Sequence, residues 1–197
     1  MLIVFGGLPG TGKTTISRAI ATRHSATYLR IDAIEQAIRD AAILAGGIGP
    51  AGYVVANVLA EGNLIGGQTV VADCVNPVGE SRDAWRAIAL RTGVRLVEVE
   101  VVCSDPLEHR RRVEARTSDI PDLICPTWQD VLERNYEPWV RPHLVVDTAR
   151  LSPDHAISVV ERYIGACVLQ PTNPRAPAAA PSTTPPAASR ARGHPRP

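Results

Sequence analysis

The sequence is poor in lysine and in aromatic residues. Of the 21 basic residues in a chain of 197, only Lys13 is a lysine, and aromatic residues make up 4% of the chain. Proteins that bind single-stranded nucleic acid need basic grooves and stacking rings, so this composition disfavours that class. With 45% hydrophobic residues the chain has enough apolar surface for a core, which excludes wholesale disorder.

Cysteine pairs and long apolar runs are also missing. The four cysteines are far apart in the sequence and form no C-x-x-C pair: Cys74, Cys103, Cys125 and Cys167. We therefore expect free thiols in a reducing cytoplasm rather than a disulfide or zinc framework. The opening residues do not match a signal peptide. The uncharged run 41–60 is broken by glycines and by Pro50, so we expect two buried helices joined by a turn and no membrane span.

Composition changes sharply near Gln170. Residues 171–197 are almost entirely Pro, Ala, Ser, Thr and Arg, and they carry four arginines and no acid. Such a segment cannot bury enough apolar surface to offset its ordering entropy, so we expect a disordered tail. Residues 1–170 then form one domain with a net charge of −3.

Within this domain, predicted strands alternate with predicted helices. Strands are expected at 2–6, 26–31, 69–73, 94–103 and 143–146. Helices are expected at 14–24, 33–45, 50–65, 80–92, 106–116, 127–136 and 153–169. This alternation predicts an α/β domain with a parallel sheet and helices on both of its faces.

A glycine-rich motif joins the first predicted strand to the first predicted helix. It fits the pattern G-x-x-x-x-G-K-[ST], and its residues are Gly7, Leu8, Pro9, Gly10, Thr11, Gly12, Lys13 and Thr14. Glycines let backbone N–H groups wrap phosphate oxygens, and the following helix directs its positive dipole end at the same anion. The motif therefore predicts a phosphate-binding loop, and we count the next residue, Thr15, among the nucleotide-binding residues.

The last two residues of the motif are expected to contact the phosphates and the metal ion. Lys13 supplies a positive charge for the β and γ phosphates, and the Thr14 hydroxyl is the expected Mg²⁺ ligand. We therefore predict ATP and Mg²⁺ as cofactors.

An acidic residue follows the second predicted strand. Asp32 has two interpretations: the N-cap of the next helix, or a general base that takes a proton from an acceptor hydroxyl. Glu35, three residues later, shares a helix face with Asp32 and could orient a substrate. Arg30 and Arg39 could bind an anionic acceptor, although we expect them to be solvated surface residues.

The third predicted strand also ends in an acid. Asp73 is expected to anchor Mg²⁺ directly or through water, and acceptor binding is its alternative role. Asn76 could hydrogen-bond the acceptor or hold its loop, and the Asn-Pro pair is also an ordinary turn signal.

Arginines cluster beyond the fourth strand, from Arg110 to Arg116. With the proline-containing loop behind them they predict a small Arg-rich lid over about residues 106–137, in which Arg112 and Arg116 share a helix face and could reach the phosphates. After the last strand, Arg150 is a candidate for contacting the adenine.

The chain resembles the small P-loop kinases with a nucleoside-monophosphate-kinase-like core. The resemblance rests on the phosphate-binding loop, Asp32, the strand end 73–76 and the arginines 110–116. Members with a similar pattern include adenylylsulfate kinase, gluconate kinase, chloramphenicol phosphotransferase, zeta toxin and polynucleotide kinase. The resemblance implies a three-layer P-loop NTPase fold with a five-stranded parallel sheet in the order 2-3-1-4-5. It also implies ATP with Mg²⁺, transfer of the γ-phosphate to a small molecule, and the base role for Asp32.

The chain departs from part of this group at Glu35. Adenylylsulfate and polynucleotide kinases tend to carry an arginine shortly after the equivalent acid, where it holds an anionic acceptor. The glutamate at this position favours a neutral or cationic acceptor, such as a sugar, an aminoglycoside-like compound or a metabolite alcohol.

The sequence leaves three candidate functions. A cytoplasmic small-molecule kinase, monomeric or homodimeric, is favoured. A nucleotide-driven ATPase switch is the first alternative, and a nucleic-acid 5′-end kinase is the second. We expect neither nucleic acid nor membrane as a partner.

Overall fold

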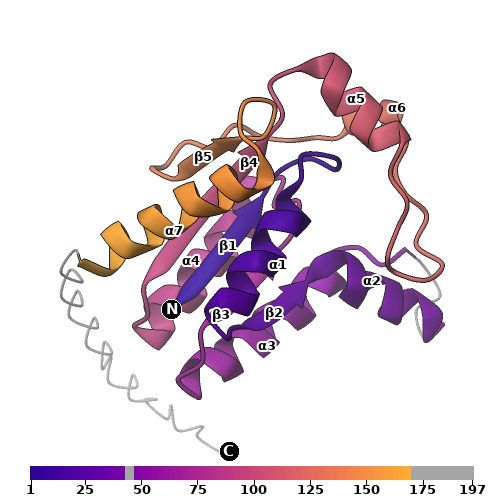
Figure 1. The fold of residues 1–197 in the computed structure, drawn as a ribbon. Coiled ribbons are helices and arrows are strands. Elements are labelled where there is room, and N and C mark those ends of the chain that lie inside the picture. Colours follow the sequence, from indigo (N-terminus) through magenta and orange to yellow (C-terminus); the bar gives the residue numbers. More distant parts are fainter. Residues whose placement is uncertain (43–46, 170–197) are drawn as a thin grey trace, which may run out of the picture.

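The computed structural model describes residues 1–42 and 47–169 (Figure 1). The strands are β1 (Leu2–Gly6), β2 (Thr27–Arg30), β3 (Val70–Asp73), β4 (Leu96–Val102) and β5 (Leu144–Asp147). The helices are α1 (Lys13–Arg23), α2 (Ile31–Asp40), α3 (Ala51–Ile65), α4 (Gly79–Thr92), α5 (Pro106–Glu114), α6 (Trp128–Glu133) and α7 (Pro153–Leu169). The predicted tail 171–197 and the end of the predicted helix 33–45 lie outside the described residues.

The five strands form one parallel sheet in the order β2-β3-β1-β4-β5, which confirms the predicted fold class. Because the strands are parallel, helical crossovers connect them. The register places Phe5 of β1 and Arg30 of β2 on either side of Asp73 of β3. The carboxyl ends of these three strands therefore lie together at one edge of the sheet, where ligands bind in open α/β folds.

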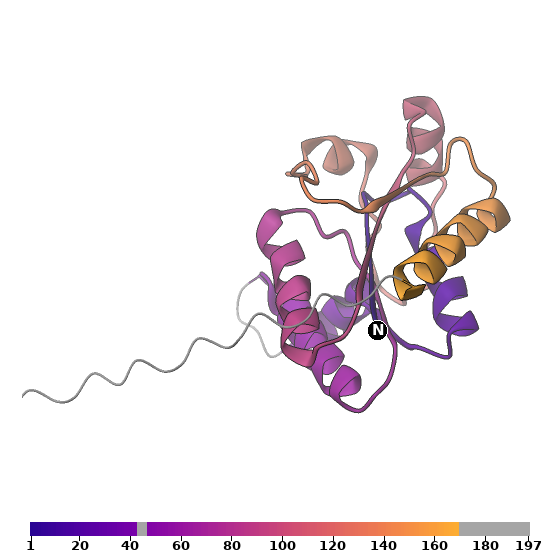
Figure 2. The same cartoon turned by 90° about the vertical axis from the view of Figure 1, so that its left-hand side faces the viewer.

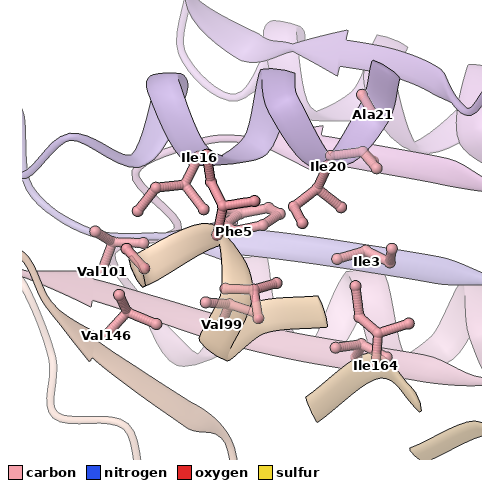
Figure 3. Packing of buried hydrophobic residues seen from close by; sticks show 14 residues of the cluster. Ile3, Phe5, Ile16, Ile20, Ala21, Val99, Val101, Val146 and Ile164 are labelled. Atoms are coloured by element: carbon pink, nitrogen blue, oxygen red, sulfur yellow. The ribbon is translucent and has the colours of Figure 1, made fainter. Parts of the chain in front are cut away.

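Both faces of the sheet are covered, and Figure 2 shows it edge-on between two layers of helices. Successive side chains of β1 point to opposite faces, so Ile3 and Phe5 belong to one apolar cluster while Leu2 and Val4 belong to the other. The first cluster packs under α1 and α7, and Figure 3 shows its close packing around Phe5. The continuous apolar sequence of β1 follows from this double burial.

The second cluster packs under α3 and α4 and surrounds the fully buried Trp85. In the described part of the uncharged run 41–60, residues 41–42 and 47–60, α3 is the one helix, because α2 ends at Asp40. One side of α3 is exposed at Val54 and Val58, so this helix is only partly buried and not the buried helix that we expected there. Among the helices within residues 1–42 and 47–169, none combines the length and the apolar character that a bilayer crossing needs.

Two helix ends near the sheet edge differ from prediction. Helix α5 ends at Glu114 instead of Arg116, and α6 ends at Glu133 instead of Tyr136. Thr127 starts α6 with a capping box in which its hydroxyl accepts the Asp130 N–H, but the backbone is already extended at Arg134. In Figure 1 the connection between α5 and α6, residues 115–127, descends from α5 toward α2.

Candidate functional site

The phosphate-binding loop, residues 7–14, has the backbone conformation that its glycines permit. Gly10 and Gly12 have φ angles of 83° and 87°, a left-handed region that costs other residues energy. A Cβ atom on Gly10 would lie 2.5 Å from Cγ2 of Val113 in α5. Glycine is therefore required at position 10 both by the backbone conformation and by the packing of α5 against the loop.

Hydrogen bonds hold this loop to its surroundings. The Gly7 N–H donates to the Val75 carbonyl at 3.0 Å, which ties the loop to the segment after β3. The Thr11 hydroxyl donates to the Leu8 carbonyl at 2.9 Å and closes the loop on itself. These bonds fix the loop shape before any phosphate binds, which reduces the entropic cost of binding.

Helix α5 and the segment after β5 contribute two further contacts. The His109 ring nitrogen Nε2 lies 2.7 Å from the Pro9 carbonyl oxygen, and the Thr148 hydroxyl donates to the Thr11 carbonyl at 2.8 Å. His109 is buried and packs edge-on against Trp128 of α6. The first helix of the predicted lid is thus packed directly on the phosphate-binding loop.

Lys13 is a buried charge at the site. Its side chain is buried, and Nζ donates to the Leu8 carbonyl at 3.4 Å. Burial lowers the pKa of its ammonium group, and the carboxylates of Asp73 and Asp32 oppose that shift. The lysine therefore lies near both predicted acids, in the position expected of a group that neutralises phosphate charge.

Asp73 ends β3 with its carboxylate almost completely buried, at 2% exposure. Its Oδ2 accepts a hydrogen bond from the Tyr28 hydroxyl at 2.7 Å and lies 4.0 Å from Nε of Arg30. Within the described residues Oδ1 makes no hydrogen bond, so one carboxylate oxygen remains for a cation or its water shell. Thr14 lies in the first turn of α1, directly after Lys13.

Asp32 is not the N-cap that one interpretation predicted. β2 passes into α2 without a loop, so Arg30 occupies the N-cap position and Asp32 lies in the first turn, where no side-chain cap bond forms. Its Oδ2 lies instead 3.7 Å from Nη2 of Arg116, which comes from the connection 115–127. Its carboxylate is about one-third exposed and accessible to a substrate.

Glu35 lies on α2 and pairs with Arg39 at 3.3 Å. Burial raises its pKa, while Arg39 opposes the shift.

Asn76 is fully buried with a φ of 54°, and neither polar atom of its side chain has a hydrogen-bond partner among the described residues. Its backbone N–H donates to the Tyr53 hydroxyl at 2.9 Å. A buried, strained and unpartnered amide is unusual in a native fold and is typical of a functional position.

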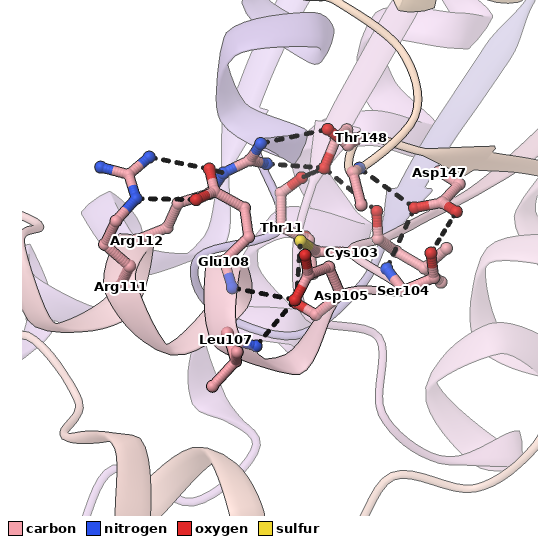
Figure 4. Close-up of polar contacts among 12 residues, drawn as sticks. Thr11, Cys103, Ser104, Asp105, Leu107, Glu108, Arg111, Arg112, Asp147 and Thr148 are labelled. Carbon is pink, nitrogen blue, oxygen red and sulfur yellow. Dashed lines mark hydrogen bonds and ion pairs between the residues drawn. The ribbon is translucent and has the colours of Figure 1, made fainter.

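The two lid arginines have different surroundings. Arg112 donates to Glu108 and to the hydroxyl and carbonyl of Thr148, as Figure 4 shows. Arg116 follows the end of α5 and faces Asp32, so the predicted shared helix face does not exist. Two guanidinium groups, those of Arg111 and Arg112, lower the pKa of Glu108 to about 2.

One cavity of about 390 Å³ joins many of these groups. It is lined by Gly10, Gly12, Lys13, Thr14, Thr15, Arg30, Arg111, Arg112, Ala115, Arg116, Thr117 and Asp119. Five of its lining residues are basic and one is acidic, so it favours an anion. The structure therefore brings together both predicted lid arginines and the phosphate-binding loop.

A second cavity of about 340 Å³ shares Gly12, Thr15, Arg111 and Arg112 with the first and extends toward the end of β5. Ile16, Leu151 and Pro153 give it apolar walls of the kind that suits a nucleobase. Arg150, the predicted adenine contact, is not among its lining residues. Its side chain is 79% exposed and pairs with Asp147 at 3.2 Å.

Sequence reasoning missed several residues of the site. Arg30 was expected to be solvated but is buried and lines the main cavity, so that expectation is wrong. Asp119, His109 and Thr148 come from segments distant in sequence, and no motif marks them. The one available signal was the position of Arg30 at the end of a predicted strand, two residues before Asp32.

Comparison with protein families gives one match, to the family described as "AAA domain", over residues 2–134. This range covers more than half of the chain and includes the phosphate-binding loop, β1 to β4 and the arginines of α5. A comparison with curated proteins finds no match.

Solved structures with the same fold include several kinases. A gluconokinase from Sinorhizobium meliloti 1021 has 21% identity and a TM-score of 0.56, covering 84% of this chain and 94% of its own. The Mycobacterium tuberculosis APS kinase CysC in complex with AMPPNP and APS has 16% identity and a TM-score of 0.60, covering 83% and 95%. Chaetomium thermophilum Kti12 in complex with ADP-AlF3 has 20% identity and a TM-score of 0.65, covering 85% and 99%.

The TM-scores and coverages of these structures show a common fold, and the match to the family model shows the family. The chain's sheet order and loop motif agree with both. The chain therefore belongs to the AAA domain family, and it shares its fold with the solved kinase structures described above.

Proposed function

We propose that the protein is an ATP-dependent phosphotransferase that moves the γ-phosphate of ATP to a hydroxyl of a small molecule. One observation carries the proposal: the phosphate-binding loop lines a basic cavity, and Arg116, which lines the same cavity, lies 3.7 Å from the Asp32 carboxylate. In this proposal an acid that can accept a proton lies beside a cation that can stabilise phosphoryl charge.

The nucleotide would lie across the two cavities. Gly10, Gly12 and Lys13 surround the place of its phosphates, and the apolar walls formed by Leu151 and Pro153 suit its base. Thr15 lines both cavities and so belongs to the nucleotide site. The proposed contact between Arg150 and the adenine requires that this arginine leave Asp147 when the nucleotide binds.

Thr14 and Asp73 fit a magnesium ion. Both are oxygen donors beside the phosphate-binding loop, and Mg²⁺ in such sites takes few protein ligands because phosphates and water complete its shell. Bound there, the ion would neutralise charge on the β and γ phosphates. Tyr28 fixes the orientation of the Asp73 carboxylate by donating to Oδ2.

Asp32 is the proposed general base. Its carboxylate accepts the proton of the acceptor hydroxyl while the acceptor oxygen bonds to the γ-phosphorus. The bond from that phosphorus to the bridging oxygen breaks, and its electron pair leaves with ADP. Arg116 faces both Asp32 and the cavity, so it would offset the charge that spreads over the transferring group.

Glu35 and Asn76 would contact the acceptor. Glu35 lies on the same helix as Asp32, and the unpartnered amide of the buried Asn76 has donors and an acceptor to offer. The segment 106–137 would act as the lid, with α5 as its fixed part and the connection 115–127 as the part that moves. Four unpaired cysteines support a reducing, cytoplasmic location.

A screen of small hydroxyl compounds tests this function. The protein with Mg²⁺ and ATP should form ADP faster in the presence of one compound class, and mass spectrometry should show that compound phosphorylated. ADP formation that no compound accelerates, with no phosphorylated product, would reject the kinase and favour the ATPase switch.

A further inference from the structure

Arg30 is a buried cation at the carboxyl end of β2. Its side chain is 7% exposed, yet the residue lines the main cavity beside Lys13 and Thr14. A buried charge is costly unless hydrogen bonds compensate it. The partners of Arg30 therefore indicate what this part of the cavity is built to hold.

Those partners are few. A guanidinium group has five N–H donors, but among the described residues Arg30 forms one side-chain hydrogen bond, from Nη1 to Oδ1 of Asp119 at 2.7 Å. Its buried Nε has no hydrogen-bond partner and lies 4.0 Å from Oδ2 of Asp73. The group thus has donors to spare for an anion in the cavity.

Asp119 is a removable partner. It lies in the connection 115–127, its side chain is 52% exposed, and Arg18 of α1 donates to its other oxygen at 2.6 Å. Hydrogen bonds from Arg18 and Arg30 hold the pKa of the Asp119 carboxyl well below its usual range. The aspartate is therefore an anion that sits between two arginines on a surface segment.

The location of Arg30 separates it from the nucleotide base. β2 lies two strands from β1, or about 10 Å at ordinary strand spacing, on the side opposite the apolar cavity. Arg30 also lies two residues before Asp32, the proposed base. A group bound at Arg30 would lie beyond the γ-phosphate, on the acceptor side of the site.

We propose that Arg30 and Arg18 form a subsite for an anionic group of the acceptor, a phosphate, sulfate or carboxylate, and that Asp119 occupies this subsite until the acceptor displaces it. The inference rests on the proposed kinase function and specifies its substrate class. It differs from the expectation drawn from Glu35, because the cation comes from the strand before Asp32 instead of the helix after it. Arg30 is then a specificity-determining residue.

Titration of the protein with sulfate tests the subsite. Saturating AMPPNP with Mg²⁺ first fills the nucleotide site, including the place of the γ-phosphate, and sulfate binding is then followed by thermal shift and calorimetry. Sulfate should bind wild type saturably, Asp119→Asn about tenfold more tightly because a competing anion is removed, and Arg30→Gln at least tenfold more weakly. Asp83→Asn is the matched control, since Asp83 is a similarly exposed aspartate paired with Arg141.

Equal sulfate affinity in wild type and Asp119→Asn would overturn the proposal, even if Arg30→Gln failed to fold. So would an Arg30→Gln variant that loses AMPPNP affinity but keeps sulfate affinity, because Arg30 would then serve the γ-phosphate. A wild-type protein that does not bind AMPPNP with Mg²⁺ would reject the kinase function separately.

Discussion

The two sides of the main cavity are held in place by different forces. The phosphate-binding loop is fixed by left-handed glycines and by backbone hydrogen bonds such as that from Gly7 to Val75. The opposite side consists of charged side chains from separate elements, joined in pairs such as Asp32 with Arg116 and Arg30 with Asp119.

The loop side of the main cavity is therefore preorganised for its ligand, whereas the arginines on the opposite side must exchange one anionic partner for another when a substrate binds. Backbone donors in a fixed loop do not need to leave another partner before a phosphate binds. Arginines that already hold carboxylates must exchange them for substrate groups, so the acceptor side can select its ligand by competition. We expect substitutions in the loop to affect all nucleotide chemistry and substitutions across the cavity to affect transfer selectively.

The largest effect is expected on the loop side. Lys13→Ala removes a buried charge that interacts more strongly with the transition state than with bound ATP, so phosphoryl transfer should slow about 10²- to 10³-fold. Steady-state rates on the acceptor found by screening would measure this loss. Near-wild-type transfer by a folded Lys13→Ala protein would contradict the whole site assignment.

Across the cavity, Asp32→Asn should slow transfer at least about a hundredfold while ATP affinity stays near normal, because only the proton acceptor is lost. Melting should change little, since Asp32 makes no cap bond and partly exposed ion pairs are worth about 1 kcal/mol or less.

Asp40→Asn, at the other end of α2, is the control for Asp32→Asn and should transfer phosphate at the wild-type rate. Full activity in Asp32→Asn would direct the search for the base to Glu35 or Asp73.

A smaller effect is expected from a substitution that tests how α5 packs against the phosphate-binding loop. Gly10→Ala places a Cβ against Val113 and requires a left-handed alanine, which together should cost about 1–3 kcal/mol and weaken nucleotide binding. Adding Val113→Ala removes Cγ2 of Val113, the atom that the new Cβ would meet. The two losses of unfolding free energy should therefore not be additive in a double-mutant cycle measured by denaturant melts. Strict additivity would show that α5 does not press on the loop.

The smallest effect concerns the tail. Truncation after Gln170 should leave the melting temperature and nucleotide affinity unchanged, because residues 171–197 contain no aliphatic side chain larger than alanine to bury. A loss of several degrees on differential scanning would show that the tail packs on the domain.

Most of the fold was predictable because it depends on local patterns. The apolar run of β1 and the loop motif each specify their own element, and α7 begins and ends where predicted. The errors lie where tertiary contacts decide. α2 starts at Ile31 because β2 joins it directly, and the position of Asp32 in the first turn could not be read from a residue type that suits a cap.

The acceptor side was less predictable for the same reason. A solvated and a buried arginine have the same local sequence signal, and only the neighbouring strand β3 and the connection 115–127 decide that Arg30 is enclosed. The pairing of Arg112 with Thr148 and the contact of His109 with Pro9 likewise join segments more than 30 residues apart.

The sequence by itself determined the phosphate-binding loop, since a backbone site of eight consecutive residues carries its whole geometry in glycine positions and one lysine. It also determined the alternation of strands and helices, because burial on both faces of a sheet requires continuous apolar runs. The tertiary structure alone decided which charges meet across the cavity: it brought Arg116 to Asp32 and Asp119 to Arg30. Ion pairs between distant segments form only when the sheet order and helix packing place both partners within a few ångströms, and no local pattern records that distance.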